Sequence, residues 1–115
     1  MGNRISIISL VAIVSTMQEA NANLTLSIDG KSASCQKSGR GCVDAVFNAV
    51  NELFHNDAVL EDYHAQLAHP GTDTDARVQV TLSVMGRQTT AEGVHPDTVI
   101  ASAYAYVEAL NQLYS

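Results

Sequence analysis

Hydrophobic and polar residues alternate in the same pattern twice along the chain. TLSIDGK spans Thr25 to Lys31 and TLSVMGR spans Thr81 to Arg87, so the copies are 81 − 25 = 56 positions apart. Alternation with period two predicts a strand with one buried face, and the glycine that follows predicts a tight turn. A polar stretch comes after each glycine and predicts the returning strand. The pattern therefore predicts one hairpin in each half of the chain.

A helical pattern follows each predicted hairpin, in GCVDAVFNAVNELF and in VHPDTVIASAYAYVEALNQLY. Hydrophobic residues recur there at three- and four-residue steps, which predicts helices with one apolar stripe. Asp44 and Asp97 are expected in the first helical turns, where the helix dipole favours negative charge. Pro96 suits a first helical position, because its missing N–H has no helical partner there. The stripe residues are Val43, Val46, Phe47, Val50, Leu53 and Phe54 in the first helix, and Val99, Ala103, Tyr106, Val107, Leu110 and Leu113 in the second.

The opening residues MGNRISIISLVAIVSTMQEANA have three readings. An apolar stretch from Ile5 to Val14 with a small-residue ending resembles a secretory signal. Met-Gly-x-x-x-Ser matches a myristoylation site. A strand is favoured, because VLEDYHAQLAH before the second hairpin, shifted back by 56 positions, falls on NRISIISLVAI. The opening thus occupies the place of a first strand.

The predicted fold is α+β: two strand–strand–strand–helix units related by an internal pseudo-two-fold. The first repeat covers about residues 4–56 and the second about residues 57–115. Each unit has a sheet and a helix with one apolar face, and neither is expected to be stable alone. We therefore expect residues 1–115 to form a single domain.

Composition narrows the possible functions. The chain has 115 residues, of which 46% are hydrophobic and 16% charged, and its net charge is −6. Six scattered basic residues do not form a phosphate-binding surface, which argues against nucleic acid. No apolar run approaches the roughly 20 residues of a membrane helix. Cys35 and Cys42 are expected to be free thiols. The four histidines lack metal-ligand spacing, and neither a catalytic set nor a cofactor motif can be named.

Several motifs together resemble the C-terminal regulatory domain of the 2-isopropylmalate synthase and citramalate synthase family. These are GRGCVDAVFNAVNEL, followed by LEDYHAQLAHPGTDTDARVQVTLSVMGRQTTAEGVHPDTVIASAYAYVEALNQL. The family pattern has G-x-G-P-V-D-A at the first helix, D-Y-x-x-x-x-x-x-G-x-D-A at the fourth strand and turn, and A-S-x-x-A-Y-x-x-A-L-N in the second helix. The resemblance runs from about Ile5 to Leu113.

The resemblance implies a cytoplasmic regulatory domain without catalytic residues, metal or cofactor. In the whole enzyme such a domain follows a TIM-barrel domain that condenses acetyl-CoA with a 2-oxo acid, which makes the parent an acyltransferase. It forms a homodimer and binds a branched-chain end product, leucine in isopropylmalate synthases and isoleucine in citramalate synthases. Binding inhibits the distant active site. Leucine is favoured here, and a dimerisation domain that no longer binds an effector remains an alternative, as does a small secreted binding protein.

The resemblance also implies which residues contact the effector. The family's proline after the second glycine is Cys42 here, and its small residue after G-x-D is Thr74, so both could alter effector choice. A helix start can bind a carboxylate through its N–H groups. Leu60 and Tyr63 are an odd number of positions apart, so on a regular strand they would face opposite sides unless a bulge intervenes. The implied contacts are Gly41, Cys42, Val43, Asp44, Leu60, Tyr63, Leu67, Thr74, Pro96 and Thr98.

Overall fold

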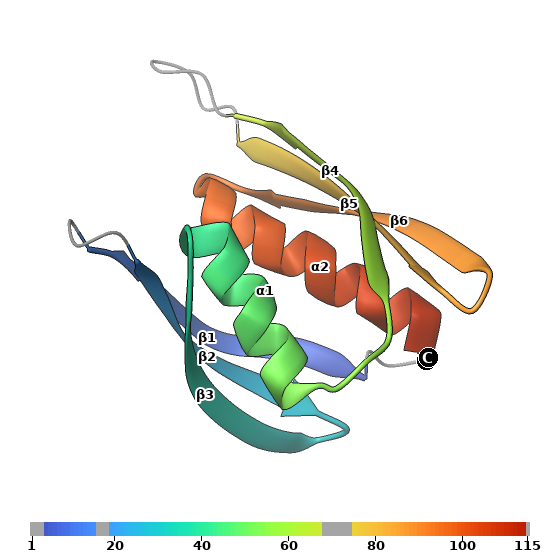
Figure 1. The fold of residues 1–115 in the computed structure, drawn as a ribbon, viewed down its shortest axis with the longest axis horizontal. Coiled ribbons are helices and arrows are strands. Elements are labelled where there is room, and N and C mark those ends of the chain that lie inside the picture. The colour runs from blue at the N-terminus through green and yellow to red at the C-terminus, as the bar shows by residue number, and fades with distance from the viewer. Residues whose placement is uncertain (1–3, 16–18, 68–74, 115) are drawn as a thin grey trace. The chain divides into compact units, whose positions relative to one another are not determined.

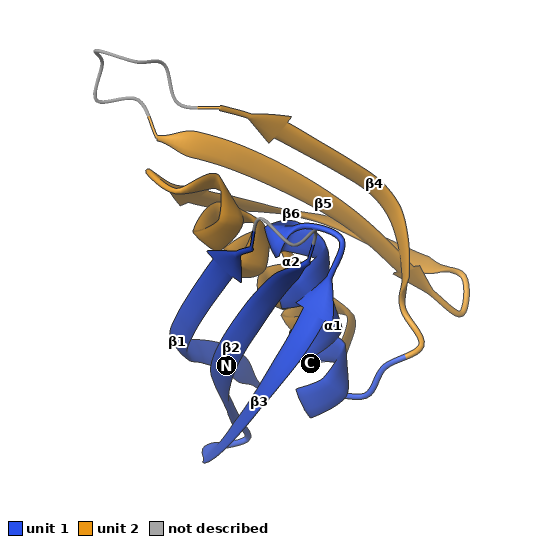
Figure 2. Cartoon of the chain, turned by 60° about the vertical axis from the view of Figure 1, so that its left-hand side comes forward, with its two compact units in different colours: residues 1–56 blue, residues 57–115 orange. Residues whose placement is uncertain are grey.

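A computed structural model describes residues 4–15, 19–67 and 75–114 of the chain. The chain divides into two compact units, residues 1–56 and residues 57–115 (Figure 2). Each unit consists of a three-stranded antiparallel sheet followed by one helix. The predicted α+β fold with two strand–strand–strand–helix units is therefore confirmed.

In the first unit, β1 (Ile5–Val14), β2 (Ala20–Ile28) and β3 (Lys31–Gly39) precede α1 (Cys42–Leu53). The strands lie side by side in sequence order, and α1 packs mainly over β2 and β3 (Figure 1). The opening residues Ile5–Val14 pair with β2 along their length, as the strand reading predicted. Alternate residues of β2 and one stripe of α1 form the core, namely Ala20, Ala22, Leu24, Leu26, Ala45, Val46, Ala49 and Val50.

In the second unit, β4 (Val59–Gln66), β5 (Ala76–Val84) and β6 (Arg87–His95) precede α2 (Thr98–Tyr114). The sheet order is again sequential, and α2 packs over β5 and β6 (Figure 1). Because α2 lies over the central strand and one edge, the inner face of β4 is less well covered. The buried residues of β5 and of the predicted α2 stripe are Ala76, Val78, Val80, Thr81, Leu82, Val84, Ala103, Tyr106, Val107, Leu110 and Leu113.

Strand register confirms the repeat but corrects one of its offsets. In β1, Ile7 pairs with Leu26, and in β4, Leu60 pairs with Leu82. The second strands are 82 − 26 = 56 positions apart, whereas the first strands are 60 − 7 = 53 positions apart. The shift of 56 therefore held for the hairpins but not for the first strands, because the paired residues Leu60 and Leu82 are three positions further apart in sequence than Ile7 and Leu26.

The two hairpin turns have the same backbone but different side chains. Asp29 and Gly30 have φ of 52° and 87°, and Met85 and Gly86 have φ of 50° and 82°. Two consecutive positive φ values are typical of the type I′ turn that joins twisted antiparallel strands. Asp tolerates positive φ, and Asp29 also accepts from Arg4 Nε at 3.2 Å. Met85 is a residue type that rarely adopts positive φ, and its side chain is 95% exposed.

Candidate functional site

The first group of implied effector residues forms the start of α1. Gly41 is the N-cap, with extended backbone (φ −151°, ψ 175°) and no capping side chain. The first helical hydrogen bond of this end runs from the Ala45 N–H to the Gly41 carbonyl at 2.9 Å. The N–H groups of Cys42, Val43 and Asp44 therefore precede the helical ladder. Such N–H groups, together with the helix dipole, favour an anion.

Asp44 stabilises the turn that leads into α1. Its Oδ2 accepts from the backbone N–H of Arg40 at 3.1 Å, while the side chain stays exposed. The end of β3 lies so close to this turn that a Cβ on Gly39 would be 2.5 Å from Ala45 N and 2.8 Å from Asp44 Oδ2. A side chain at residue 39 would therefore push the strand end away from the helix start. The glycine keeps the α1 start in place.

The second group lies on β4, where a bulge decides which way the side chains face. The register shifts between Leu60 and Asp62, so Glu61 is the extra residue. Leu60 then pairs with Leu82 and Tyr63 with Val80. Directly paired residues share a face, and both partners are fully buried, so Leu60 and Tyr63 point to the same inner face. The expected conflict between these two residues is thus resolved by the bulge.

The inner face of β4 presents apolar surface. Leu60 is 44% exposed, Leu67 is 60% exposed and Tyr63 is half-buried. Leu67 follows Tyr63 at an even step, just beyond the end of β4. Leu60, Tyr63 and Leu67 form an apolar row on β4. This row can contact a branched side chain, whose burial is favourable because apolar surface is removed from water.

Tyr63 is joined to α2 through Ser102. The Tyr63 hydroxyl lies 2.7 Å from Ser102 Oγ, and Ser102 Oγ donates to the Thr98 carbonyl at 2.8 Å. Two implied effector residues, Tyr63 on β4 and Thr98 in the first turn of α2, are therefore linked by Ser102, which belongs to the family's second-helix pattern but not to the implied contacts. The sequence signals for this role were the serine of the family's A-S-x-x-A-Y pattern and its place in an apolar helical run.

The start of α2 is capped by its own chain, unlike that of α1. Asp97 Oδ1 accepts from the N–H groups of Val99 and Ile100 at 2.8 and 3.1 Å, and the Asp97 N–H donates to His95 Nδ1 at 2.9 Å. Asp97 is thus the N-cap, and α2 begins at Thr98. The expectation that Pro96 takes the first helical position and Asp97 the first turn is wrong. Asp97 lies just before the helix, because its carboxylate accepts hydrogen bonds from the first-turn N–H groups.

The structure brings the implied residues together only in part. Gly41, Cys42, Val43 and Asp44 are contiguous at the α1 start. Tyr63 and Thr98 are joined through Ser102 in the second unit. Thr74 lies outside the described residues.

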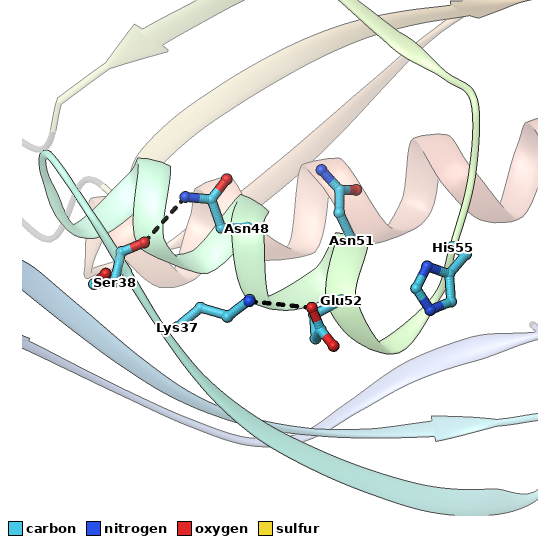
Figure 3. Close-up of a pocket in the computed structure, with 6 residues that line it drawn as sticks. All are labelled: Lys37, Ser38, Asn48, Asn51, Glu52 and His55. Atoms are coloured by element: carbon cyan, nitrogen blue, oxygen red, sulfur yellow. Dashed lines mark hydrogen bonds and ion pairs between the residues drawn. The ribbon is translucent and has the colours of Figure 1, made fainter.

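A polar hollow of about 390 Å³ lies elsewhere in the first unit, along the later turns of α1 and β3 (Figure 3). Lys37 Nζ lies 3.1 Å from Glu52 Oε1, and Asn48 Nδ2 donates to the Ser38 carbonyl at 3.0 Å. None of the implied effector residues lines it. Because its lining is polar, it does not suit a branched apolar side chain; the lining residues are Lys37, Ser38, Asn48, Asn51, Glu52 and His55.

The described residues hold no group of three or more His, Cys, Asp or Glu side chains placed to bind a metal ion. Cys35 and Cys42 are free thiols. The Cys35 thiol donates to the Ala49 carbonyl at 3.4 Å, and burial, reinforced by the charge of Glu52, raises its pKa. Among the described parts of the chain, no helix has the length and apolar character needed to cross a membrane.

Comparison with known proteins gives a family match over nearly the whole chain. Residues 1–114 match the model of the family described as "LeuA allosteric (dimerisation) domain". The chain is 43% identical over 111 residues to 2-isopropylmalate synthase of Methylorubrum populi and 44% identical over 111 residues to that of Methylobacterium nodulans. It is 42% identical over 113 residues to that of Afipia carboxidovorans. These alignments cover 96–98% of the chain but only 21–22% of each relative.

Proposed function

The chain belongs to the LeuA allosteric (dimerisation) domain family, and from this premise we propose that it binds leucine as a feedback effector. In this proposal the chain forms a homodimer, leucine binds at the dimer interface, and binding inhibits an attached acetyl-CoA-dependent 2-isopropylmalate synthase in the cytoplasm. The chain spans about a fifth of the length of its curated relatives, which are named 2-isopropylmalate synthases. The condensing activity is assigned to the remaining part of such a protein, and none to this chain.

The open start of α1 is the observation that carries the proposal. Gly41 supplies no capping side chain, so N–H groups of the first turn can donate to the effector carboxylate. The start of α2 offers no such site, because Asp97 already accepts from its N–H groups. Asp44 stays exposed beside the α1 start and can accept from the effector ammonium.

The apolar row on β4, taken by itself, suits the branched side chain of an effector. Complete burial of a leucine-sized side chain contributes roughly 1.5–3 kcal/mol. Micromolar affinity requires about 8 kcal/mol, so the charged ends must supply most of the remainder. Charge-assisted hydrogen bonds contribute about 1.5–3 kcal/mol each, which is sufficient if both the carboxylate and the ammonium are bound.

Inhibition requires that leucine bind two states of the enzyme unequally. An effector at a dimer interface meets this requirement when the two packings of the subunits present different contacts to it. The proposed role of leucine is therefore to favour the packing in which the attached enzyme is inactive.

Calorimetric titration with leucine, isoleucine and valine tests the proposal on the 115-residue chain. We expect heat from leucine, weaker binding of the other two, and loss of binding in Tyr63→Ala. Tighter binding of isoleucine would indicate the effector domain of a citramalate synthase. No heat and no thermal shift with any of the three would refute effector binding and leave dimerisation, which sedimentation measures independently.

A further inference from the structure

Ser102 is a fully buried hydroxyl on a helix face built mainly from small apolar residues. Its exposed fraction is 0%, and its sequence neighbours Ala101 and Ala103 are equally buried. An alanine would fill the same space without a polar group. A serine that bonds back to the carbonyl four residues earlier gains little for the helix and often bends it. Packing within α2 therefore does not explain why residue 102 has a hydroxyl group.

The hydrogen-bond directions around Ser102 follow from proton counting. A carbonyl oxygen can only accept, so the single Ser102 proton goes to the Thr98 carbonyl. The proton in the 2.7 Å contact with Tyr63 must then come from the phenol. Tyr63 thus donates to Ser102, and Ser102 donates to Thr98. The phenol proton is used within the protein, which holds the ring at a defined place beside the first turn of α2.

This link compensates for the weak cover over β4. The helix packs over β5 and β6, while Leu60 on the inner face of β4 stays 44% exposed. The bulge at Glu61 turns Tyr63 toward the helix side, and Ser102 then fixes the end of its side chain. Ser102 Oγ thus links the edge strand to the first turn of the helix.

We propose that Ser102 is a positioning residue for effector recognition, which holds the Tyr63 ring in the orientation that contacts the effector side chain. This inference rests on the proposed function and on the effector contacts that the resemblance implies for Tyr63 and Thr98. Ser102 itself does not touch the ligand. Its contribution is preorganisation, because a ring already held in the bound orientation loses less freedom when the ligand arrives.

Two variants remove the same hydrogen bond from opposite ends. Ser102→Ala removes the acceptor, and Tyr63→Phe removes the donor but keeps the ring. Each is expected to weaken leucine binding by about 3- to 10-fold, the range that one neutral hydrogen bond accounts for. The double variant should be no weaker than either single one, because both remove one interaction.

Thr81→Val is the matched control. Thr81 and Thr90 share a hydroxyl–hydroxyl hydrogen bond of 2.8 Å in the same unit. Thr81 alternates with Val80 and Leu82 along β5, so its hydroxyl lies on the other face of the sheet from Tyr63. The valine keeps the shape of the side chain. It should bind leucine as the parent chain does.

Leucine affinity by calorimetry and melting temperature with and without leucine provide the readouts. A purely structural serine would lower the melting temperature but leave affinity and the leucine-induced shift unchanged, whereas a positioning serine reduces both. Parent-like affinity in Ser102→Ala or additive losses in the double variant would overturn the inference. If the parent and Thr81→Val also give no leucine signal, the proposed function itself fails, and this inference is refuted with it.

Discussion

Gly41→Asp should abolish effector binding while making the chain more stable. Gly41 has extended backbone that any residue adopts, and a Cβ there has no heavy atom within 4 Å. An aspartate fits without strain and can accept from the first-turn N–H groups of α1. The new carboxylate would then occupy the position proposed for the effector carboxylate, as Asp97 does at the start of α2.

The opposite effects on stability and binding can be estimated separately. Replacing glycine by a good N-cap residue contributes a few tenths of a kcal/mol, and the helix dipole adds about 0.3–1 kcal/mol for a negative charge. The melting temperature should therefore rise by a few degrees. Loss of two charge-assisted hydrogen bonds at about 1.5–3 kcal/mol each corresponds to binding at least about 100-fold weaker.

Circular dichroism melting and calorimetric titration with leucine measure the two effects. Gly41→Ala is the control, because it adds a side chain but no acceptor and should bind within about threefold of the parent. Gly41→Asn caps the helix without a charge. Comparing its leucine affinity with that of Gly41→Asp shows whether binding is weakened by the loss of free N–H groups or by charge repulsion. Undiminished leucine affinity in a stabilised Gly41→Asp chain would refute the placement of the carboxylate at the α1 start.

Three further predictions concern single residues. Met85→Asn should raise the free energy of unfolding by about 0.5–1 kcal/mol, because asparagine tolerates the φ of 50°; an unchanged urea midpoint would count against strain in this turn. Asp97→Ala should lower the free energy of unfolding by about 1 kcal/mol through loss of the α2 cap, and a loss below about 0.3 kcal/mol would argue against the capping role. Burial raises the pKa of Cys35, so its thiol should react slowly with iodoacetamide at pH 8 and faster in urea; equal rates would contradict this. Because the pKa is higher in the folded state, the associated stability is present below the unfolded value of 9.0 and declines as pH rises through and above it.

Local patterns were sufficient to predict the hairpins and helices. Asp29-Gly30 sits between alternating residues and forms the turn that this pair favours. The stripe containing Val46 and Val50 lies on the buried side of α1. The repeated pattern indicated a first strand at Ile5–Val14 where a signal peptide was an alternative, although the offset of the first strands is 53 and not 56. Each of these inferences depends on residues close in sequence or on a repeated pattern, both of which the sequence displays directly.

The site depended on contacts that sequence does not display. Leu60 and Tyr63 share a face because of a bulge, which is defined only by pairing with the partner strand. The period-two rule applied to the sequence of β4 alone therefore placed them on opposite faces. Ser102 meets Tyr63 across 39 positions of sequence.

The starts of α1 and α2 follow similar motifs yet differ in capping, because one N-cap is a glycine and the other an aspartate whose carboxylate accepts from N–H groups of its own helix. Sequence thus determined the elements and their repeat through local preferences. The tertiary structure decided which side chains converge and which backbone donors stay available, because both depend on how distant segments pair.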